Sequence, residues 1–299
     1  MEANNVIGIY LTDICNYKCV FCSVDVPSKT DESIMKDDIY KILKENMNSK
    51  YKTIALWGGE PTLRKDFMKI ISKIKENNYE NIIVETNASM IADVTFANRS
   101  IELGVNCFII SIHGADAEMQ DDISLVKGSY NKIITAITNI KEKGVYVRTN
   151  TVINKQNYEQ IPAIVKLLID LKVDHINLSG LRLVGSAARN LKEVTPKFTD
   201  VVRYLKEAFE IAIQSNTYIT YDVIPACIMN GYEERQLKWA GFKMFYKDKS
   251  INDFSLFINS LKYKGVNCMK CKNLYQCGGV FRGYIDLYGW SEFGYEMIS

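Results

Sequence analysis

The chain has 299 residues, of which 47% are hydrophobic and 24% charged, a composition typical of a globular protein with a sizeable core. Its formal net charge of +2 gives no electrostatic reason to expect a nucleic acid or a membrane surface as a partner. No apolar run approaches the roughly 20 residues that a membrane-spanning helix needs, and the first residues lack the apolar region of a secretion signal. We therefore expect a cytoplasmic location, where the eight cysteines favour metal or catalytic roles over disulfides.

Strand-like and helix-like segments alternate along the first 215 residues. Short apolar runs predict strands at Val6–Leu11, Thr53–Trp57, Asn81–Glu85, Cys107–Ile112, Val145–Val152 and His175–Leu178. Apolar residues at helical spacing predict helices at Lys36–Met47, Asp66–Glu76, Asp93–Leu103, Tyr130–Lys143, Tyr158–Leu171 and Thr199–Gln214. Alternating units of this size imply a parallel sheet with right-handed crossovers, either a partial barrel or an open doubly wound sheet.

The chemically distinctive residues of this region lie at or just past the ends of the predicted strands. A loop with three cysteines follows the first strand, and Gly58–Pro61 follows the second. Thr86–Asn87 follows the third strand, and Ser111–His113 closes the fourth. Because the carboxyl ends of parallel strands carry the active site in α/β folds, we expect one ligand site built from all of these segments.

The loop after the first predicted strand carries Cys15, Cys19 and Cys22 at the spacing C-x3-C-x2-C. Three thiolates this close together could hold three irons of a [4Fe-4S] cluster, whereas clusters that only carry electrons normally have four thiolate ligands. A three-ligand cluster leaves one iron open to a substrate or cofactor, as a three-ligand zinc does in catalysis. A zinc knuckle or a group of buried cysteines is the alternative interpretation of the spacing.

This loop resembles the C-x3-C-x-Φ-C motif of the radical S-adenosylmethionine (radical SAM) enzymes, in which Φ is aromatic and is here Phe21. The resemblance implies that Cys15, Cys19 and Cys22 ligate three irons, that the amino and carboxylate groups of SAM chelate the fourth, and that Phe21 lies near the adenine. One electron from a flavodoxin or ferredoxin would then cleave SAM into methionine and a 5′-deoxyadenosyl radical, which abstracts a hydrogen atom from the substrate. The resemblance also selects a partial (β/α)6 TIM-like barrel for residues 1–215.

The turn Gly58-Gly59-Glu60-Pro61 matches the GGEP motif of the same family. Its glycines allow a ligand to approach the backbone closely, and the resemblance implies that the backbone and Glu60 hold the methionyl amine of SAM. Further SAM contacts are implied at positions where polar side chains also commonly cap helices and close turns. These positions are Thr86, Asn87, Ser111, Arg148, Asn150 and, beside the adenine, Leu181. The resemblance assigns no residue to the chemistry on the substrate.

Beyond residue 215 the regular pattern ends, and the segment 216–299 contains Cys227, Cys268, Cys271 and Cys277. Four thiolates saturate one [4Fe-4S] cluster or one structural Zn²⁺, and their spacing does not choose between them. The resemblance favours a cluster, because many radical SAM enzymes append a small SPASM or shortened twitch domain. Phe281 occupies the position of the last SPASM cysteine, so we expect a small α+β domain with one auxiliary [4Fe-4S] cluster.

The resemblance leaves the substrate open. Radical SAM barrels with a small multi-cysteine domain mostly mature ribosomally made peptides or proteins by crosslinking, epimerisation or oxidation, which is our first hypothesis. The barrel begins almost at once, so a separate peptide-recognition protein is an expected partner. The alternative is a small-molecule enzyme acting on a nucleotide or sugar in cofactor or antibiotic biosynthesis, with Arg182 and Arg189 as candidates for binding phosphate. A third hypothesis, a non-enzymatic iron–sulfur carrier or scaffold, needs no SAM motifs and is disfavoured by them.

Overall fold

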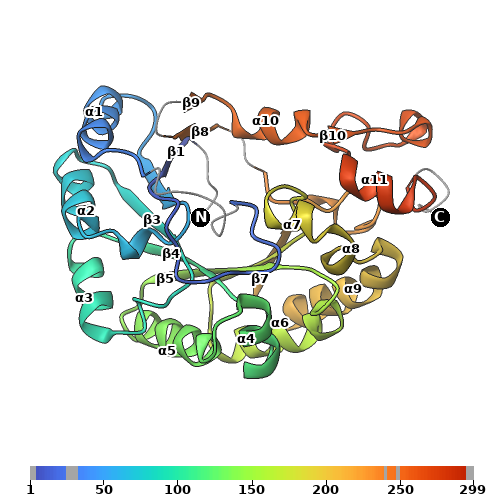
Figure 1. Ribbon diagram of the computed structural model, residues 1–299, viewed down its shortest axis with the longest axis horizontal. Helices are drawn as coiled ribbons and strands as arrows, with labels where there is room; N and C mark the ends of the chain where they lie inside the picture. The colour runs from blue at the N-terminus through green and yellow to red at the C-terminus, as the bar shows by residue number, and fades with distance from the viewer. Residues whose placement is uncertain (1–4, 25–32, 239–240, 247–249, 294–299) are drawn as a thin grey trace.

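The structure, a computed structural model, describes residues 5–24, 33–238, 241–246 and 250–293. Within these residues a curved nine-stranded sheet has the strand order β7-β6-β5-β4-β3-β2-β1-β8-β9 (Figure 1). Neighbouring strands are parallel except β8 and β9, which are antiparallel. The strands are β1 (Val6–Tyr10), β2 (Thr53–Trp57), β3 (Asn81–Thr86), β4 (Cys107–Ser111), β5 (Tyr146–Val152), β6 (His175–Ser179), β7 (Tyr218–Asp222), β8 (Phe242–Phe245) and β9 (Ser250–Ile251).

Amphipathic helices cover the outer face of the curved sheet (Figure 1). In α2, for example, Phe67, Ile70, Ile71 and Ile74 recur at helical spacing and all are buried. The longer helices are α1 (Lys36–Asn46), α2 (Phe67–Glu76), α3 (Val94–Glu102), α4 (Ala117–Ser124), α5 (Ser129–Glu142), α6 (Ile161–Asp170) and α9 (Phe198–Gln214). The shorter elements are α7 (Ser186–Arg189), α8 (Leu191–Val194), α10 (Phe254–Ser260), α11 (Arg282–Tyr288), β10 (Lys262–Tyr263) and β11 (Val280–Phe281).

The predicted α/β partial barrel is confirmed, and its six expected strands and six expected helices lie at the predicted places. Several of the described elements were not predicted, among them α4, β7 and β8. The helix α4 is short and rich in polar residues, and β8 has only four residues, so neither gives a clear periodic signal. The strand β7 was not predicted either, although it pairs with β6 in the main sheet.

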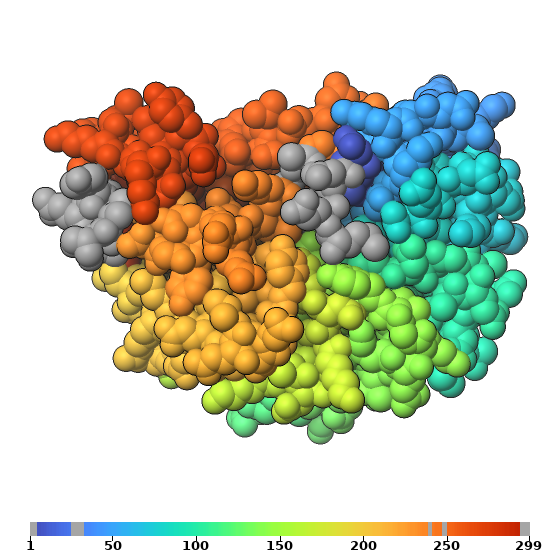
Figure 2. Space-filling view, turned by 180° about the vertical axis from the view of Figure 1, so that it is seen from behind, coloured from blue at the N-terminus to red at the C-terminus, as the bar shows by residue number. Residues whose placement is uncertain are grey.

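The main sheet continues past the predicted boundary between residues 215 and 216. Both β7 and β8 come after that boundary, and they extend the sheet at β6 and at β1. The remaining C-terminal elements pack beside α9, where Phe198 stacks on Tyr284 with ring centroids 4.6 Å apart. Seen from behind, this C-terminal region lies directly against the rest of the molecule (Figure 2). The division into two domains stays a prediction.

Alternation along the strands separates the core from the barrel interior. In β4, Phe108 and Ile110 are fully buried on the outer, apolar side, whereas Cys107, Ile109 and Ser111 line the interior. Successive side chains of a strand point to opposite faces, so the same division recurs across the sheet. The outer layer is thus an apolar core under the helices, and the interior carries mixed polar and apolar side chains. None of the described helices has the length and apolar character that a membrane span requires.

Gly8 of β1 determines how closely β8 can join the sheet. A Cβ at this position would lie 2.6 Å from both Met244 Sδ and the Phe242 ring. We expect Gly8→Ala to lower the free energy of unfolding by about 1–3 kcal/mol, the usual cost of overpacking, as measured by urea denaturation. Because part of the clash is with a flexible side chain, the cost should be smaller in a Met244→Ala background. Equal costs in both backgrounds would show that Gly8 does not limit this packing.

Candidate active site

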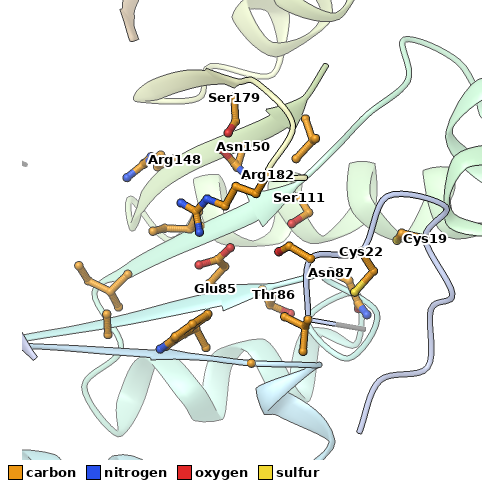
Figure 3. Close-up of a pocket in the computed structure, with 18 of the residues that line it drawn as sticks. Cys19, Cys22, Glu85, Thr86, Asn87, Ser111, Arg148, Asn150, Ser179 and Arg182 are labelled. Carbon is orange, nitrogen blue, oxygen red and sulfur yellow. The ribbon is translucent and has the colours of Figure 1, made fainter. Parts of the chain in front are cut away.

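A cavity of about 240 Å³ occupies the barrel interior and opens at the carboxyl ends of the strands (Figure 3). The cysteine loop closes one side of it, and strands from β1 to β8 contribute the walls. The predicted site residues that line this cavity are Cys15, Cys19, Phe21, Cys22, Gly58, Gly59, Thr86, Asn87, Ser111, Arg148 and Asn150. The structure therefore brings together residues that lie on five separate segments of the sequence.

Backbone hydrogen bonds attach the cysteine loop to its neighbours. The Gly59 amide donates to the Thr12 carbonyl at 2.7 Å, and the Glu60 amide donates to the Ile14 carbonyl at 2.7 Å. From the end of α4, the Ile123 and Ser124 carbonyls accept hydrogen bonds from the loop amides at 3.2 and 3.1 Å. The loop is thus held between the turn after β2 and a helix that sequence reasoning missed.

The Glu60 carboxylate is fully buried and lies behind the cavity wall. It accepts hydrogen bonds from the Thr62 amide at 3.1 Å, the Thr86 hydroxyl at 2.8 Å and the Asn87 amide at 2.6 Å, and a further one from the Thr62 hydroxyl. Burial raises the pKa of this carboxyl, and these donors oppose the shift. The carboxylate therefore joins the turn after β2 to the end of β3.

The glycines of this turn, unlike Glu60, present their backbone to the cavity. Gly58 has a φ of +141°, and a Cβ there would lie 2.6 Å from the Thr12 carbonyl oxygen. Only glycine fits this position, because the backbone conformation and the close approach both exclude a side chain. Pro61 is buried at the start of a short 3₁₀ helix (Pro61–Leu63) and does not line the cavity.

The surroundings of the three cysteines fit a metal cluster. The Tyr17 amide donates to Cys15 Sγ at 3.4 Å, and Asn87 Nδ2 lies 3.6 Å from the same sulfur. The buried Tyr17 hydroxyl lines the cavity and has no hydrogen-bond partner in the described part of the chain. Burial raises the pKa of Cys15 to about 11 and raises that of Cys19 as well, so the bare thiols stay protonated without a cation.

Among the residues that the structure describes, no three His, Cys, Asp or Glu side chains converge on a point where one metal ion would sit. In a [4Fe-4S] cluster each thiolate binds a different iron, so its ligands do not converge on a single ion. The spacing of Cys15, Cys19 and Cys22 around the cavity fits this second arrangement.

Phe21 and His113 form a wall of the cavity. Their rings meet edge to face with centroids 4.8 Å apart, and His113 Nδ1 accepts the Val152 amide at 3.2 Å. Burial lowers the pKa of His113 to about 3, so this imidazole is neutral near pH 7. Leu181 packs in the apolar cluster that contains Phe21, behind the cavity wall.

The floor of the cavity is charged, and sequence reasoning found only part of it. Glu85, Arg148, Arg182 and Asp222 line it, with Arg182 Nη2 3.7 Å from Asp222 Oδ2. Glu85 and Asp222 were not predicted, although the alternation of inward-facing residues along β3 would have pointed to Glu85. Arg189, the other arginine proposed for phosphate binding, is exposed and lies outside the cavity.

The four C-terminal cysteines line a second, smaller cavity, together with Asn273. The Asn273 amide donates to Cys271 Sγ and the Gly279 amide to Cys277 Sγ, both at 3.4 Å. Two buried donors, Asn273 Nδ2 and the Tyr221 hydroxyl, have no acceptor within the described ranges. Burial raises the pKa of Tyr221, and the nearby Glu233, Cys277 and Cys227 add to the shift. This donor-rich, thiol-lined cavity fits a negatively charged metal–thiolate centre.

The fold and the main cavity define an α/β-barrel protein whose ligand site lies at the carboxyl edge of a parallel sheet. Residues 9–168, more than half of the chain, match the family model of the radical SAM superfamily, and the chain belongs to that superfamily. The family uses a [4Fe-4S] cluster and SAM as cofactors.

Sequence relatives include the probable GTP 3',8-cyclase of Sulfurisphaera tokodaii, 28% identical over 214 residues, which are 71% of this chain and 67% of that protein. The corresponding protein of Saccharolobus solfataricus is 30% identical over 188 residues, which are 62% of this chain and 60% of that protein. The match therefore spans about three fifths to two thirds of these relatives.

Solved structures with the same fold include SuiB of Streptococcus suis bound to S-adenosylmethionine, with a TM-score of 0.69 and 18% identity over 99% of this chain and 77% of that chain. Another is anSMEcpe with bound AdoMet, with a TM-score of 0.69 and 15% identity over 98% of this chain and 94% of that one. At these identities the likeness establishes the fold.

We expect Glu60→Gln to weaken SAM binding through the turn that Glu60 holds. The carboxamide N–H group would face one of the donors whose hydrogen bond the carboxylate now accepts. This clash should cost roughly 1–3 kcal/mol in unfolding free energy. The displaced turn should lower SAM affinity by about ten-fold or more, measured by equilibrium dialysis on reconstituted protein. The control is Glu80→Gln, at an exposed carboxylate. Unchanged SAM affinity in Glu60→Gln would contradict this role.

Proposed function

We propose that Cys15, Cys19 and Cys22 hold the [4Fe-4S] cluster of this radical SAM enzyme and that SAM binds beside it in the main cavity. The observation that carries the proposal is that all three cysteines and the two glycines of the turn line that one cavity. When bound, cluster and SAM supply a 5′-deoxyadenosyl radical that abstracts a hydrogen atom, with the electron coming from a flavodoxin or ferredoxin. The chain's own residues shape the enclosure that holds SAM.

Most of the predicted SAM contacts have a role in this arrangement, whereas Pro61 and Leu181 do not line the cavity. The Gly58 and Gly59 backbone lies open to the methionyl end of SAM, while Glu60 fixes the turn. Phe21 offers its ring to the adenine, and neutral His113 supports that ring from the side. The remaining polar groups of the upper cavity available to the ribose and carboxylate are Thr86, Asn87, Ser111 and Asn150. Thr86 also donates to Glu60, so its hydroxyl is partly used in the fold.

For the substrate we propose a small molecule of the nucleotide type. Two observations support this assignment: the sequence relatives named above are probable GTP 3',8-cyclases, and the charged side chains Glu85, Arg148, Arg182 and Asp222 line the cavity. Such a floor suits the polar groups of a compact ligand inside the barrel.

A peptide substrate is the second candidate. It is favoured by the similarity to SuiB and anSMEcpe, which extends over nearly the whole chain. SuiB has a solved structure bound to the precursor peptide SuiA, and anSMEcpe has one with bound AdoMet and the Kp18Cys peptide. Because the likeness is below 20% identity, it supports this candidate less directly than the sequence relatives support a nucleotide.

We further propose that Cys227, Cys268, Cys271 and Cys277 hold one auxiliary [4Fe-4S] cluster within a small domain at 216–299. All four line one cavity whose buried donors lack acceptors. The Tyr221 hydroxyl and Asn273 Nδ2 would donate to its sulfur atoms.

The two cluster assignments predict a specific iron count. Anaerobically reconstituted protein should contain about eight irons, and a Cys15/Cys19/Cys22→Ala variant about four. Only the unchanged protein should form 5′-deoxyadenosine after reduction with dithionite in the presence of SAM. If the unchanged protein instead holds about four irons and one zinc, and the variant only the zinc, the C-terminal cysteines form a structural zinc site. Equal iron in both proteins would remove the proposed role of the three-cysteine loop.

The substrate assignment predicts which compounds accelerate SAM cleavage. With reduced enzyme and SAM, GTP or another guanine nucleotide should raise the rate of 5′-deoxyadenosine formation several-fold over the substrate-free rate. The reason is that the 5′-deoxyadenosyl radical becomes 5′-deoxyadenosine when it takes a hydrogen atom from the substrate. A panel of Cys-, Ser- and Tyr-containing peptides should leave the rate unchanged. The opposite pattern, acceleration by a peptide alone, would reject the nucleotide assignment in favour of the second candidate.

A further inference from the structure

Glu85 is the side chain of the cavity whose purpose the fold does not explain. It lies on β3, one residue before Thr86, and its side chain points into the cavity beneath the Arg182 guanidinium (Figure 3). In the part of the chain that the structure describes, its carboxylate makes no hydrogen bond and no ion pair within 4.0 Å. Its oxygens therefore face the interior of the cavity.

A carboxylate taken out of water is costly unless donors satisfy it. Burial raises the pKa of the Glu85 carboxyl, and the more distant Arg182 and Arg148 oppose that shift only in part. Carboxylates with a structural role in this protein look different: Glu60 accepts four hydrogen bonds, and Asp66 pairs with Arg64 at 2.9 Å. The contrast indicates that the missing donors of Glu85 come from a ligand.

The position of Glu85 places such a ligand next to the cofactor site. Two residues further along the chain, Asn87 lies against Cys15 Sγ at 3.6 Å. The strand register aligns Glu85 with Ile109 of β4, and Ile109 with Arg148 of β5, so these side chains share one layer of the barrel. A group held by Glu85 would therefore lie one layer deeper in the barrel than the residues proposed to hold SAM, within the same cavity.

The charges of the floor indicate what kind of group fits there. Among the described cavity-lining residues, the two guanidinium groups of Arg148 and Arg182 face the two carboxylates of Glu85 and Asp222. Arg182 lies 3.7 Å from Asp222 and Arg148 lies near both carboxylates, so neither arginine is an isolated charge, while Lys262 adds a further cation close to Asp222. A neutral group rich in N–H donors satisfies Glu85 without adding a charge to this set of side chains.

We propose that Glu85 is a specificity residue that binds two adjacent N–H donors of the substrate, as presented by the 2-amino-4-oxopyrimidine edge of guanine. The two carboxylate oxygens accept two parallel hydrogen bonds from such an edge, the same bidentate geometry that a guanidinium offers. This inference rests on the proposed nucleotide substrate and adds to it which end of the substrate enters the barrel: the base, with the phosphates directed away from the floor.

The test uses equilibrium dialysis to compare how tightly guanosine and inosine bind to reconstituted enzyme in the presence of SAM. Inosine lacks the exocyclic amino group of guanosine. Guanosine should bind the unchanged enzyme on the order of ten-fold or more tightly than inosine. Glu85→Gln should weaken guanosine binding roughly ten- to hundred-fold, the usual effect of losing a hydrogen bond to a charged group. Glu118→Gln, at an exposed carboxylate on α4, should bind guanosine like the unchanged enzyme.

Two results would overturn the role of Glu85: unchanged guanosine affinity in Glu85→Gln, or a fall in its thermal unfolding temperature, which would mark a structural carboxylate. If no nucleoside binds the unchanged enzyme, the nucleotide assignment fails, and agmatine then tests Glu85 separately, because its guanidinium also presents adjacent N–H donors. Agmatine binding that Glu85→Gln abolishes supports donor recognition by Glu85 on another substrate. Absence of agmatine binding rejects the role of Glu85 as well.

Discussion

The buried Glu60 carboxylate is the interaction on which the site depends. One side chain accepts hydrogen bonds from its own turn and from the end of β3, and the same turn is bonded to the loop that carries the cysteines. Three segments far apart in the sequence are thereby held at one edge of the sheet. Since a carboxylate without these donors would be expensive to bury, the turn, the strand end and the loop adopt their positions together or not at all.

Both cysteine groups have surroundings that suit the clusters proposed for them. The pKa of Cys15 and Cys19 is raised by burial, and the Tyr17, Tyr221 and Asn273 side chains hold buried donors without acceptors in the described residues. Bound iron would lower the pKa of the thiols, and the resulting anionic sulfurs would accept those donors. On this proposal, cluster binding would stabilise the local structure at both places, as metal binding does in other metal–thiolate sites.

The sequence predicted the fold, and it pointed to residues that line the upper part of one cavity, because both signals are encoded locally. Strand and helix periods depend on neighbouring residues, and the cysteine loop and the glycine turn are short contiguous motifs. The strands β7 and β8 escaped prediction because their place is fixed by pairing with β6 and β1, across long stretches of chain. The charged floor escaped prediction for the same reason, because only the folding of the curved sheet brings Glu85 of β3 and Asp222 of β7 to the wall of one cavity.

This difference explains why the chemistry of the enzyme is easier to infer than its substrate. Radical generation requires the same cofactors throughout the superfamily, so the residues that hold them form recognisable motifs at the rim of the barrel. On our proposal the substrate would contact single inward-facing side chains one layer deeper, and each of these could change without affecting the fold or the cofactor site. Similarity at 15–18% identity therefore establishes the fold of the barrel but gives no information on the side chains at the floor of the cavity. The identity of the substrate has to be read from the charges in that layer, where two arginines lie near Glu85 and Asp222.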